Sequence, residues 1–142
     1  MTCTFFGQGD TTQDTADKAE RAIAELIREK GVCLFYVGNH GGFDKTVVSI
    51  LRRLKAAYPH IEYYVVLSYV PTASGALSKN TLLPENIETA HPKGAIHKRN
   101  MWMIENSDYV ITYFAHGLSR AYRYKKAAIK RGKTVIEISD IT

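Results

Sequence analysis

Cysteine, proline and long apolar runs are scarce in this sequence of 142 residues, and each shortage excludes a class of protein. The 2 cysteines, Cys3 and Cys33, are too few for a disulfide framework and too far from the histidines in sequence for a recognisable zinc pattern. We expect both to be reduced, buried thiols. The longest nearly apolar run, Tyr63 to Val70, is far shorter than the ~20 residues of a membrane-spanning helix. Because the first residues also lack a basic region, we expect a cytoplasmic protein with no membrane partner.

Motifs of metal, cofactor and nucleophile chemistry are missing as well. The 5 histidines form neither a His-x-x-x-His nor a His-x-Glu pattern, although His40 and His116 fall in loops considered below. No Walker loop or Gly-x-Gly-x-x-Gly fingerprint occurs, and Ser119 lies in no Gly-x-Ser-x-Gly frame. We therefore expect no metal ion and no cofactor.

What the chain does have is a globular composition, with 45% hydrophobic and 23% charged residues, and an uneven distribution of charge. Residues 1–90 carry 9 Lys and Arg against 10 Asp and Glu, whereas residues 91–142 carry 10 against 4. An excess of positive charge in the last third suits an anionic ligand, either a phosphorylated small molecule or a nucleic-acid backbone. The alternative is a solvated basic helix face.

Strand-like and helical patterns alternate along the chain. The expected strands are Thr2–Phe6, Val32–Val37, Ile61–Tyr69, Tyr109–Phe114 and Thr134–Ile138, and the expected helices are Asp14–Lys30, Asp44–Tyr58, Ala95–Glu105 and Ser119–Arg131. Asp14 or Thr15 is expected to cap the first helix and Asp44 the second, with Gly31 and Gly132 beyond helix ends. This alternation predicts one domain, residues 1–142, with a parallel sheet between two helix layers. The proline-rich stretch Pro71–Pro92 is expected to be an irregular lid or specificity loop.

Three glycine-containing loops are candidates for a ligand site. In a sheet of order 3-2-1-4-5, ligands bind at the carboxyl edge beside the switch point between the first and fourth strands. The loops expected there are Gly7–Thr12, Gly38–Asp44 and Ala115–Arg120. Glycines let backbone N–H groups approach a phosphate, and a helix that begins at Ser119 would add N–H donors. Each glycine can equally be a simple turn requirement.

The stretch Ile96–Met103 holds a further candidate. On a helix, Arg99 and Asn100 project in neighbouring directions, so that a guanidinium could bind a phosphate or carboxylate while the amide reads a ribose hydroxyl or base edge. Spacing alone favours a surface Lys98–Arg99 pair on a helix whose Met101, Trp102 and Ile104 pack.

Three segments resemble the SLOG superfamily, and the closest branch is the short bacterial proteins of the DUF1273 type. The segments are Thr4–Gly7, Phe35–Asp44 and Lys98–Met103 followed by Ser107–Ile111. The resemblance implies an α/β, Rossmann-like three-layer domain with a mostly parallel five-stranded sheet, and the binding of a nucleotide or nucleotide derivative. The superfamily also includes LOG phosphoribohydrolases, which cleave the N-glycosidic bond of nucleoside monophosphates, and the DNA-processing protein DprA.

Departures from the family pattern affect the expected activity. Arg99 matches an arginine of LOG enzymes, but the segment Phe114–Lys126 lacks their catalytic Glu, and Ser119 and Arg120 replace two glycines. Gln8 and Gly9 stand where relatives tend to have His and a basic residue. The catalytic residues therefore stay unknown, whereas the expected ligand-binding residues are Gly7, Gln8, Gly38, Asn39, Gly41, Gly42, Asp44, Arg99, Asn100, Gly117, Ser119 and Arg120.

Three functions remain open at this point. The first is a binding module that senses or sequesters a nucleotide-like phosphate ester, with its phosphate at the amino end of the Ser119 helix. The second is a nucleotide N-glycoside hydrolase or deoxyribosyltransferase-like enzyme that takes a carboxylate from Asp10, Asp44, Glu85 or Glu88. The third is nucleic-acid binding through Arg120, Arg123, Lys126 and Lys130, which share one helical face. The expected partner is a nucleotide-derived small molecule, with nucleic acid and a homodimer as alternatives.

Overall fold

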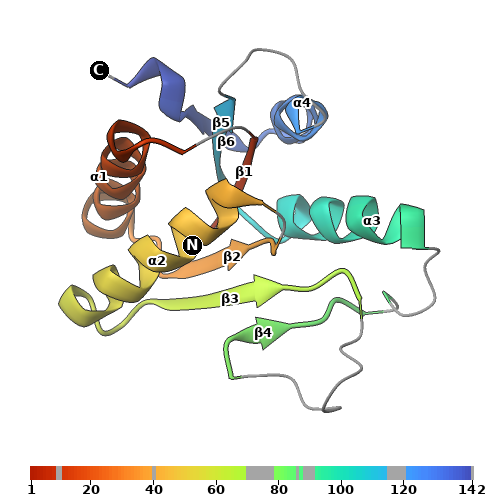
Figure 1. Cartoon of the computed structure of the whole chain (residues 1–142), viewed down its shortest axis with the longest axis horizontal. Coiled ribbons are helices and arrows are strands. Elements are labelled where there is room, and N and C mark those ends of the chain that lie inside the picture. The colour runs from red at the N-terminus through yellow and green to blue at the C-terminus, as the bar shows by residue number, and fades with distance from the viewer. Residues whose placement is uncertain are drawn as a thin grey trace.

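The computed structural model describes residues 1–8, 11–39, 41–69, 79–85, 87, 92–114 and 121–141. Strands and helices alternate over most of this range, as the sequence predicts (Figure 1). In chain order the elements are β1 (Thr2–Gln8), α1 (Gln13–Lys30), β2 (Leu34–Val37), α2 (Gly42–Ala57), β3 (Glu62–Val66), β4 (Thr81–Leu82), α3 (Pro92–Glu105), β5 (Tyr109–Phe114), α4 (Tyr122–Lys130), β6 (Thr134–Glu137) and the 3₁₀ helix η2 (Ile138–Asp140).

The sheet has 6 strands in the order β4-β3-β2-β1-β5-β6, and all of its neighbouring strands run parallel. The α/β class and the mostly parallel sheet are therefore confirmed, but the expected count of five strands is wrong. The additional strand β4 lies within the segment expected to be irregular and pairs with β3 through Val65↔Thr81 and Val66↔Leu82. A strand of 2 residues is too short to produce a periodic sequence pattern.

Two apolar clusters separate the sheet from its helices. The larger contains residues of α1 and α2 packed on strands β1, β2, β3 and β5, among them Ile23, Leu51 and Phe35. The smaller contains Met103 and Ile104 of α3, together with residues of α4 and the sheet. Figure 1 shows α1 and α2 together on one side of the strands and α3 and α4 on the other. The three layers follow, because each parallel strand must be covered on both faces.

Strand β1 lies in the middle of the sheet, between strands that are distant from it in sequence. It pairs with β2 from Thr2↔Leu34 to Thr4↔Tyr36 and with β5 from Cys3↔Tyr109 to Gln8↔Phe114. The chain first adds strands on the β2 side and then crosses to the β5 side. The switch point therefore lies between β1 and β5, at their carboxyl ends.

The helix ends differ in part from the expected caps. Thr12, rather than Asp14 or Thr15, caps α1, because its Oγ1 accepts a hydrogen bond of 3.1 Å from the N–H of Thr15. Gly41, rather than Asp44, is the N-cap of α2. The predicted helix-ending role of Gly31 is confirmed, since it adopts the left-handed conformation with φ of 71°.

The two cysteines have different surroundings. Both are free thiols, and Cys3 is buried as expected, which raises the pKa of its thiol because burial disfavours the thiolate. Cys33 is exposed, so the prediction of a second buried thiol is wrong. It lies between the buried Val32 and the first residue of β2, Leu34, and so precedes the strand that the helix layers cover. None of the helices among the described residues has the length and apolar character of a membrane span.

Candidate functional site

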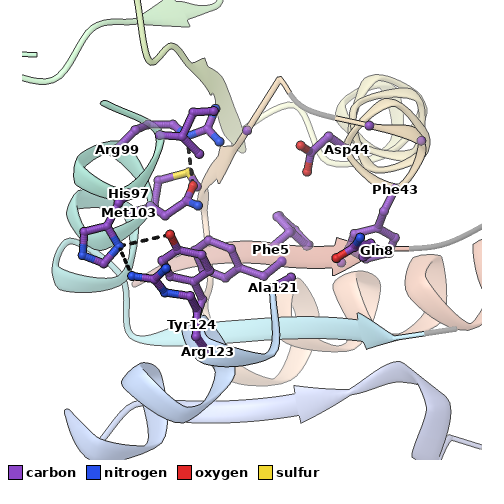
Figure 2. A pocket seen from close by; sticks show the side chains of 17 residues that line it. Phe5, Gln8, Phe43, Asp44, His97, Arg99, Met103, Ala121, Arg123 and Tyr124 are labelled. Atoms are coloured by element: carbon purple, nitrogen blue, oxygen red, sulfur yellow. Dashed lines mark hydrogen bonds between the residues drawn. The ribbon is translucent and has the colours of Figure 1, made fainter. Parts of the chain in front are cut away.

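A cavity of about 530 Å³ opens at the carboxyl edge of the sheet, beside the switch point. Its wall comes from the end of β1, the start of α2, the inner side of α3 and the start of α4 (Figure 2). Of the site residues expected from the sequence, those that line it are Gly7, Gln8, Gly38, Gly41, Gly42, Asp44, Arg99 and Asn100. Asn39 contacts Arg99 from the adjoining loop. Gly117, Ser119 and Arg120 lie outside the described residues, as do His40 and His116.

Arg99 of α3 is the best-anchored polar group of the cavity. Its Nη1 donates to Asn39 Oδ1 at 2.8 Å and to the carbonyl of Val66 at 3.3 Å, and its Nε donates to Asn100 Oδ1 at 3.0 Å. The residue is only 3% exposed, so the surface Lys98–Arg99 pair favoured by spacing is wrong for Arg99, whereas Lys98 is exposed. No acceptor among the described residues takes a hydrogen bond from Nη2. A buried guanidinium thus keeps donor capacity for a ligand.

Burial also sets the electrostatics of this arginine. Desolvation lowers the pKa of Arg99, and the nearby carboxylate of Asp44 acts in the opposite direction. An arginine remains protonated at neutral pH in any such environment because its ordinary pKa is so high. The cavity therefore contains a permanent, poorly solvated positive charge that an anionic group would stabilise.

Gly38 allows Asp44 and Arg99 to approach the end of β2. A Cβ atom at position 38 would lie 3.0 Å from Asp44 Oδ2 and 3.3 Å from Arg99 Cζ, which is closer than ordinary van der Waals contact. The absence of a side chain at this position lets a carboxylate and a guanidinium from two different helices face the same small volume. In Figure 2 they lie on opposite sides of the opening.

The amino end of α2 contributes backbone donors. Its N-cap Gly41 has a φ of 98°, which side-chain-bearing residues rarely adopt, and no side chain of the described residues caps the helix. The first-turn N–H groups, such as those of Gly42 and Phe43, have no acceptor within the helix. A helix of 16 residues thus directs its positive dipole end at the cavity. Asp44 lies in the same turn and is 9% exposed.

Apolar and aromatic side chains form the remaining wall, and the sequence reasoning did not identify them. Phe6 stacks on Tyr124 with ring centroids 5.2 Å apart, and Phe43 packs 5.6 Å from Tyr113. The lining residues outside the expected ligand-binding set are Phe5, Phe6, Phe43, Ile96, His97, Met103, Ala121, Arg123 and Tyr124, of which Arg123 was expected only as a nucleic-acid contact. Helical spacing from Arg99 could have indicated Ile96 and Met103, which lie one turn to either side of it. No such signal existed for the α4 residues, whose approach depends on tertiary packing.

Of the four acidic residues considered for catalysis, one lines the cavity. Asp44 lines the cavity, whereas Glu85 does not, and Asp10 and Glu88 lie outside the described residues. Within the described ranges, no group of three or more His, Cys, Asp or Glu side chains could hold a metal ion.

Compared with models of known protein families and with curated proteins, the sequence matches none of either. The likeness to the SLOG superfamily therefore stays a prediction that depends on the residues quoted for it. What can be argued about function depends on the cavity itself.

Proposed function

We propose that this protein binds a nucleotide or nucleotide-derived phosphate ester in the cavity at the carboxyl edge of its sheet. One observation carries the proposal: the buried Arg99 and the amino end of α2 line the same cavity. Nη2 of Arg99 donates to no acceptor among the described residues, and none of their side chains caps α2. Guanidinium groups and the N–H groups at a helix start both bind phosphate well. The cavity volume of about 530 Å³ is in the range of small-molecule sites.

A nucleotide fits the wall better than an inorganic anion does, because the wall offers three kinds of contact. Arg99 and the start of α2 suit a phosphate, and the carboxylate of Asp44 suits a hydroxyl group of the sugar. The Phe6 and Tyr124 rings provide an apolar surface suited to a base. An anion alone would leave Asp44 facing a like charge, whereas a sugar hydroxyl can donate to it.

Replacement of Arg99 tests this proposal. We expect Arg99→Ala to weaken AMP binding by roughly 1.5–3 kcal/mol, the value of a charge-assisted hydrogen bond, in isothermal titration calorimetry. Arg21→Ala is the matched control, because Arg21 is exposed on α1. Since Arg99 also supports Val66 and Asn39, thermal unfolding must show that the variant is folded at the titration temperature. Unchanged AMP affinity in a folded Arg99→Ala protein would contradict the proposal.

The hydrolase alternative has one observation in its favour, the position of Asp44 in the cavity wall. Hydrolysis of an N-glycosidic bond proceeds through an oxocarbenium-like transition state, which a carboxylate can stabilise or help to attack with water. Asp44 is the only described carboxylate in the lining. The LOG-type Glu is absent from the segment Phe114–Lys126, so that a conventional LOG site is not available.

We expect no appreciable release of adenine from AMP, because a well-placed general acid or base is worth ~10²–10⁴ in rate. Chromatography of AMP incubated with the protein measures adenine and ribose 5-phosphate directly. Turnover at ordinary enzymatic rates that disappears in Asp44→Asn would instead establish the hydrolase function.

A further inference from the structure

His97 and Arg123 separate the cavity from a second hollow, which lies between α3 and α4. Both residues line the cavity, and both also line an open groove of about 570 Å³ between α3 and α4. The rest of the groove includes Lys126, Lys130 and Arg131, with Ile129 exposed between them. The two hollows are therefore neighbours that share a wall of two side chains.

Arg123 contacts both His97 and Tyr124 in this wall. Its Nη2 lies 3.0 Å from Nδ1 of His97, and its guanidinium lies 5.3 Å above the ring of Tyr124. Because a guanidinium can only donate, Nδ1 of His97 is the acceptor in this contact. The hydroxyl of Tyr124, 3.1 Å from the same Nδ1, must then donate as well. Figure 2 shows the three side chains together at one end of the cavity.

Arg123 Nη2 and the Tyr124 hydroxyl share the single lone pair on Nδ1 of His97, so neither donor is fully satisfied. Arg123 is exposed, in contrast to Arg99, and can change its partner without being withdrawn from a buried position. It is thus the cationic group at the cavity rim that a ligand could recruit at small structural cost. A phosphate oxygen would be a stronger acceptor than the shared imidazole nitrogen.

The groove beyond Arg123 is strongly positive. Its cationic members are Arg123, Lys126, Lys130 and Arg131, and none of the described residues in its lining carries a carboxylate. Arg131 lies 4.0 Å from Glu105 in an exposed ion pair, and the other three have no acidic partner among the described residues. Like charges held close together repel one another, and this arrangement attracts a multiply charged anion.

We propose that the ligand carries a second, distal anionic group that passes the His97–Arg123 wall and lies in the groove of α4. The inference rests on the proposed function, since Arg99 and the start of α2 hold the first phosphate. It specifies the ligand class as a nucleotide with at least two phosphate groups, rather than a nucleoside monophosphate. The apolar rings between the two cationic ends are available to the nucleoside.

Calorimetric titration of AMP, ADP and adenosine 3′,5′-bisphosphate tests the inference. We expect ADP or adenosine 3′,5′-bisphosphate, or both, to bind wild-type protein roughly 10-fold more tightly than AMP. This factor corresponds to the low end of the free energy of one charge-assisted hydrogen bond. Arg123→Gln should remove that advantage, so that ADP and adenosine 3′,5′-bisphosphate bind the variant no more tightly than AMP does. Arg123→Lys, which keeps the charge, should retain part of it. Arg21→Gln on α1 removes the same charge far from the groove and should change nothing.

The outcomes separate this inference from the function on which it rests. If AMP binds as tightly as both bisphosphorylated probes, or if Arg123→Gln weakens all three equally, the second anion site is wrong while the nucleotide site stands. If none of the three binds, both are wrong. If an eight-residue oligodeoxyadenylate binds more tightly than every mononucleotide and loses affinity in Arg123→Gln, the groove is a nucleic-acid site and the inference is also overturned.

Discussion

Glycine at position 7 is required by one aromatic ring. A Cβ atom there would lie 2.4 Å from Cδ2 of Phe43, and Phe43 is 2% exposed at the start of α2. The contact holds the helix end against the last residues of β1. The sequence suggested Gly7 as a phosphate-loop glycine, and its pairing with Phe43 could not be foreseen because the two residues are joined only by tertiary packing. The size of the residue at position 7 therefore controls where the amino end of α2 lies.

We predict that Gly7→Ala lowers the free energy of unfolding by about 1–3 kcal/mol, the usual effect of overpacking a core contact. Adding Phe43→Leu should recover part of this loss, so that the double variant is more stable than the sum of the two single changes implies. Urea unfolding measures all three proteins. Gly94→Ala is the control, because no atom lies within 4 Å of its added Cβ and alanine favours helix α3 by roughly 0.5–1 kcal/mol. Strict additivity would refute the Gly7–Phe43 coupling.

Arg99 illustrates the limit of single-residue prediction in another way. Its identity and its helix were predictable, and so was its place near the carboxyl edge of the sheet. Its burial was not, because the acceptors Asn39 and Val66 come from the ends of β2 and β3. Charge and spacing on a single helix carry no information about acceptors that other strands supply.

At the scale of elements, most helices and strands were predictable from periodicity, and so was the helix-ending Gly31, while the residues that cap the helix starts were not. A helix start is decided by which hydroxyl reaches the first free N–H groups, and Thr12, Asp14 and Thr15 are all chemically suitable. The strand expected at Ile61–Tyr69 ends at Val66, and Ile138 begins η2 rather than extending β6. Leu67 and Ile138 are apolar beyond the strand ends because they are buried there, whereas Tyr69 is exposed.

The cap of α1 gives a prediction at this scale. We expect Thr12→Ala to lower the free energy of unfolding by about 1 kcal/mol, because the N–H of Thr15 loses its acceptor. Asp14→Ala should have a smaller effect, since the pair of Asp14 with Lys18 at 3.1 Å is an exposed ion pair. Urea unfolding at low and high salt separates the effects of the two variants, because salt screens the Asp14–Lys18 ion pair but does not weaken the hydrogen bond of the Thr12 cap. An Asp14→Ala loss that is larger and insensitive to salt would make Asp14 the true cap.

Glu137 joins β6 to its neighbours and makes stability depend on pH. Its carboxylate accepts from Thr112 Oγ1 at 2.7 Å, Ser139 Oγ at 2.8 Å and Lys125 Nζ at 3.1 Å. Burial alone would raise the pKa of Glu137, but these hydrogen bonds outweigh it and lower that pKa below the ordinary value of 4.5. Because the pKa of Glu137 is lower in the folded state, its carboxylate stabilises the fold fully above the ordinary pKa. This stabilisation is lost as the pH falls through the pKa of the folded protein.

We therefore predict that Glu137→Gln costs about 1.5–3 kcal/mol of stability at neutral pH, the range for a hydrogen-bonded charged group. The difference from wild type should shrink as the pH falls below 4.5 and the carboxyl of the wild type becomes protonated. Denaturant unfolding at several pH values measures this difference. Glu105→Gln, which alters only the long exposed pair with Arg131, should be nearly neutral. A difference that grows on acidification would contradict the assigned direction.

At the scale of the whole molecule, the alternating pattern was sufficient to predict three layers and the parallel sheet. The order 3-2-1-4-5 assumed from the sequence also describes those five strands, with β4 added at the edge beyond β3. The sheet order places the ligand loops at one edge, which explains why many predicted site residues line one cavity. Apart from Arg99 and Asn100, the residues that α3 and α4 contribute to the wall were not predicted, because the pattern specifies layers and not which helix residues meet.

The central place of β1 has a consequence for the order in which the protein is made. When the chain emerges from the ribosome, β1 can pair with β2 after about thirty further residues, but its other partner begins only at Tyr109. One edge of β1 therefore stays unpaired during most of synthesis. An unpaired strand edge can associate with other nascent chains. The proposed ligand cavity lies over this same seam between β1 and β5. Ligand binding would thus favour only chains in which the first and last thirds have already met.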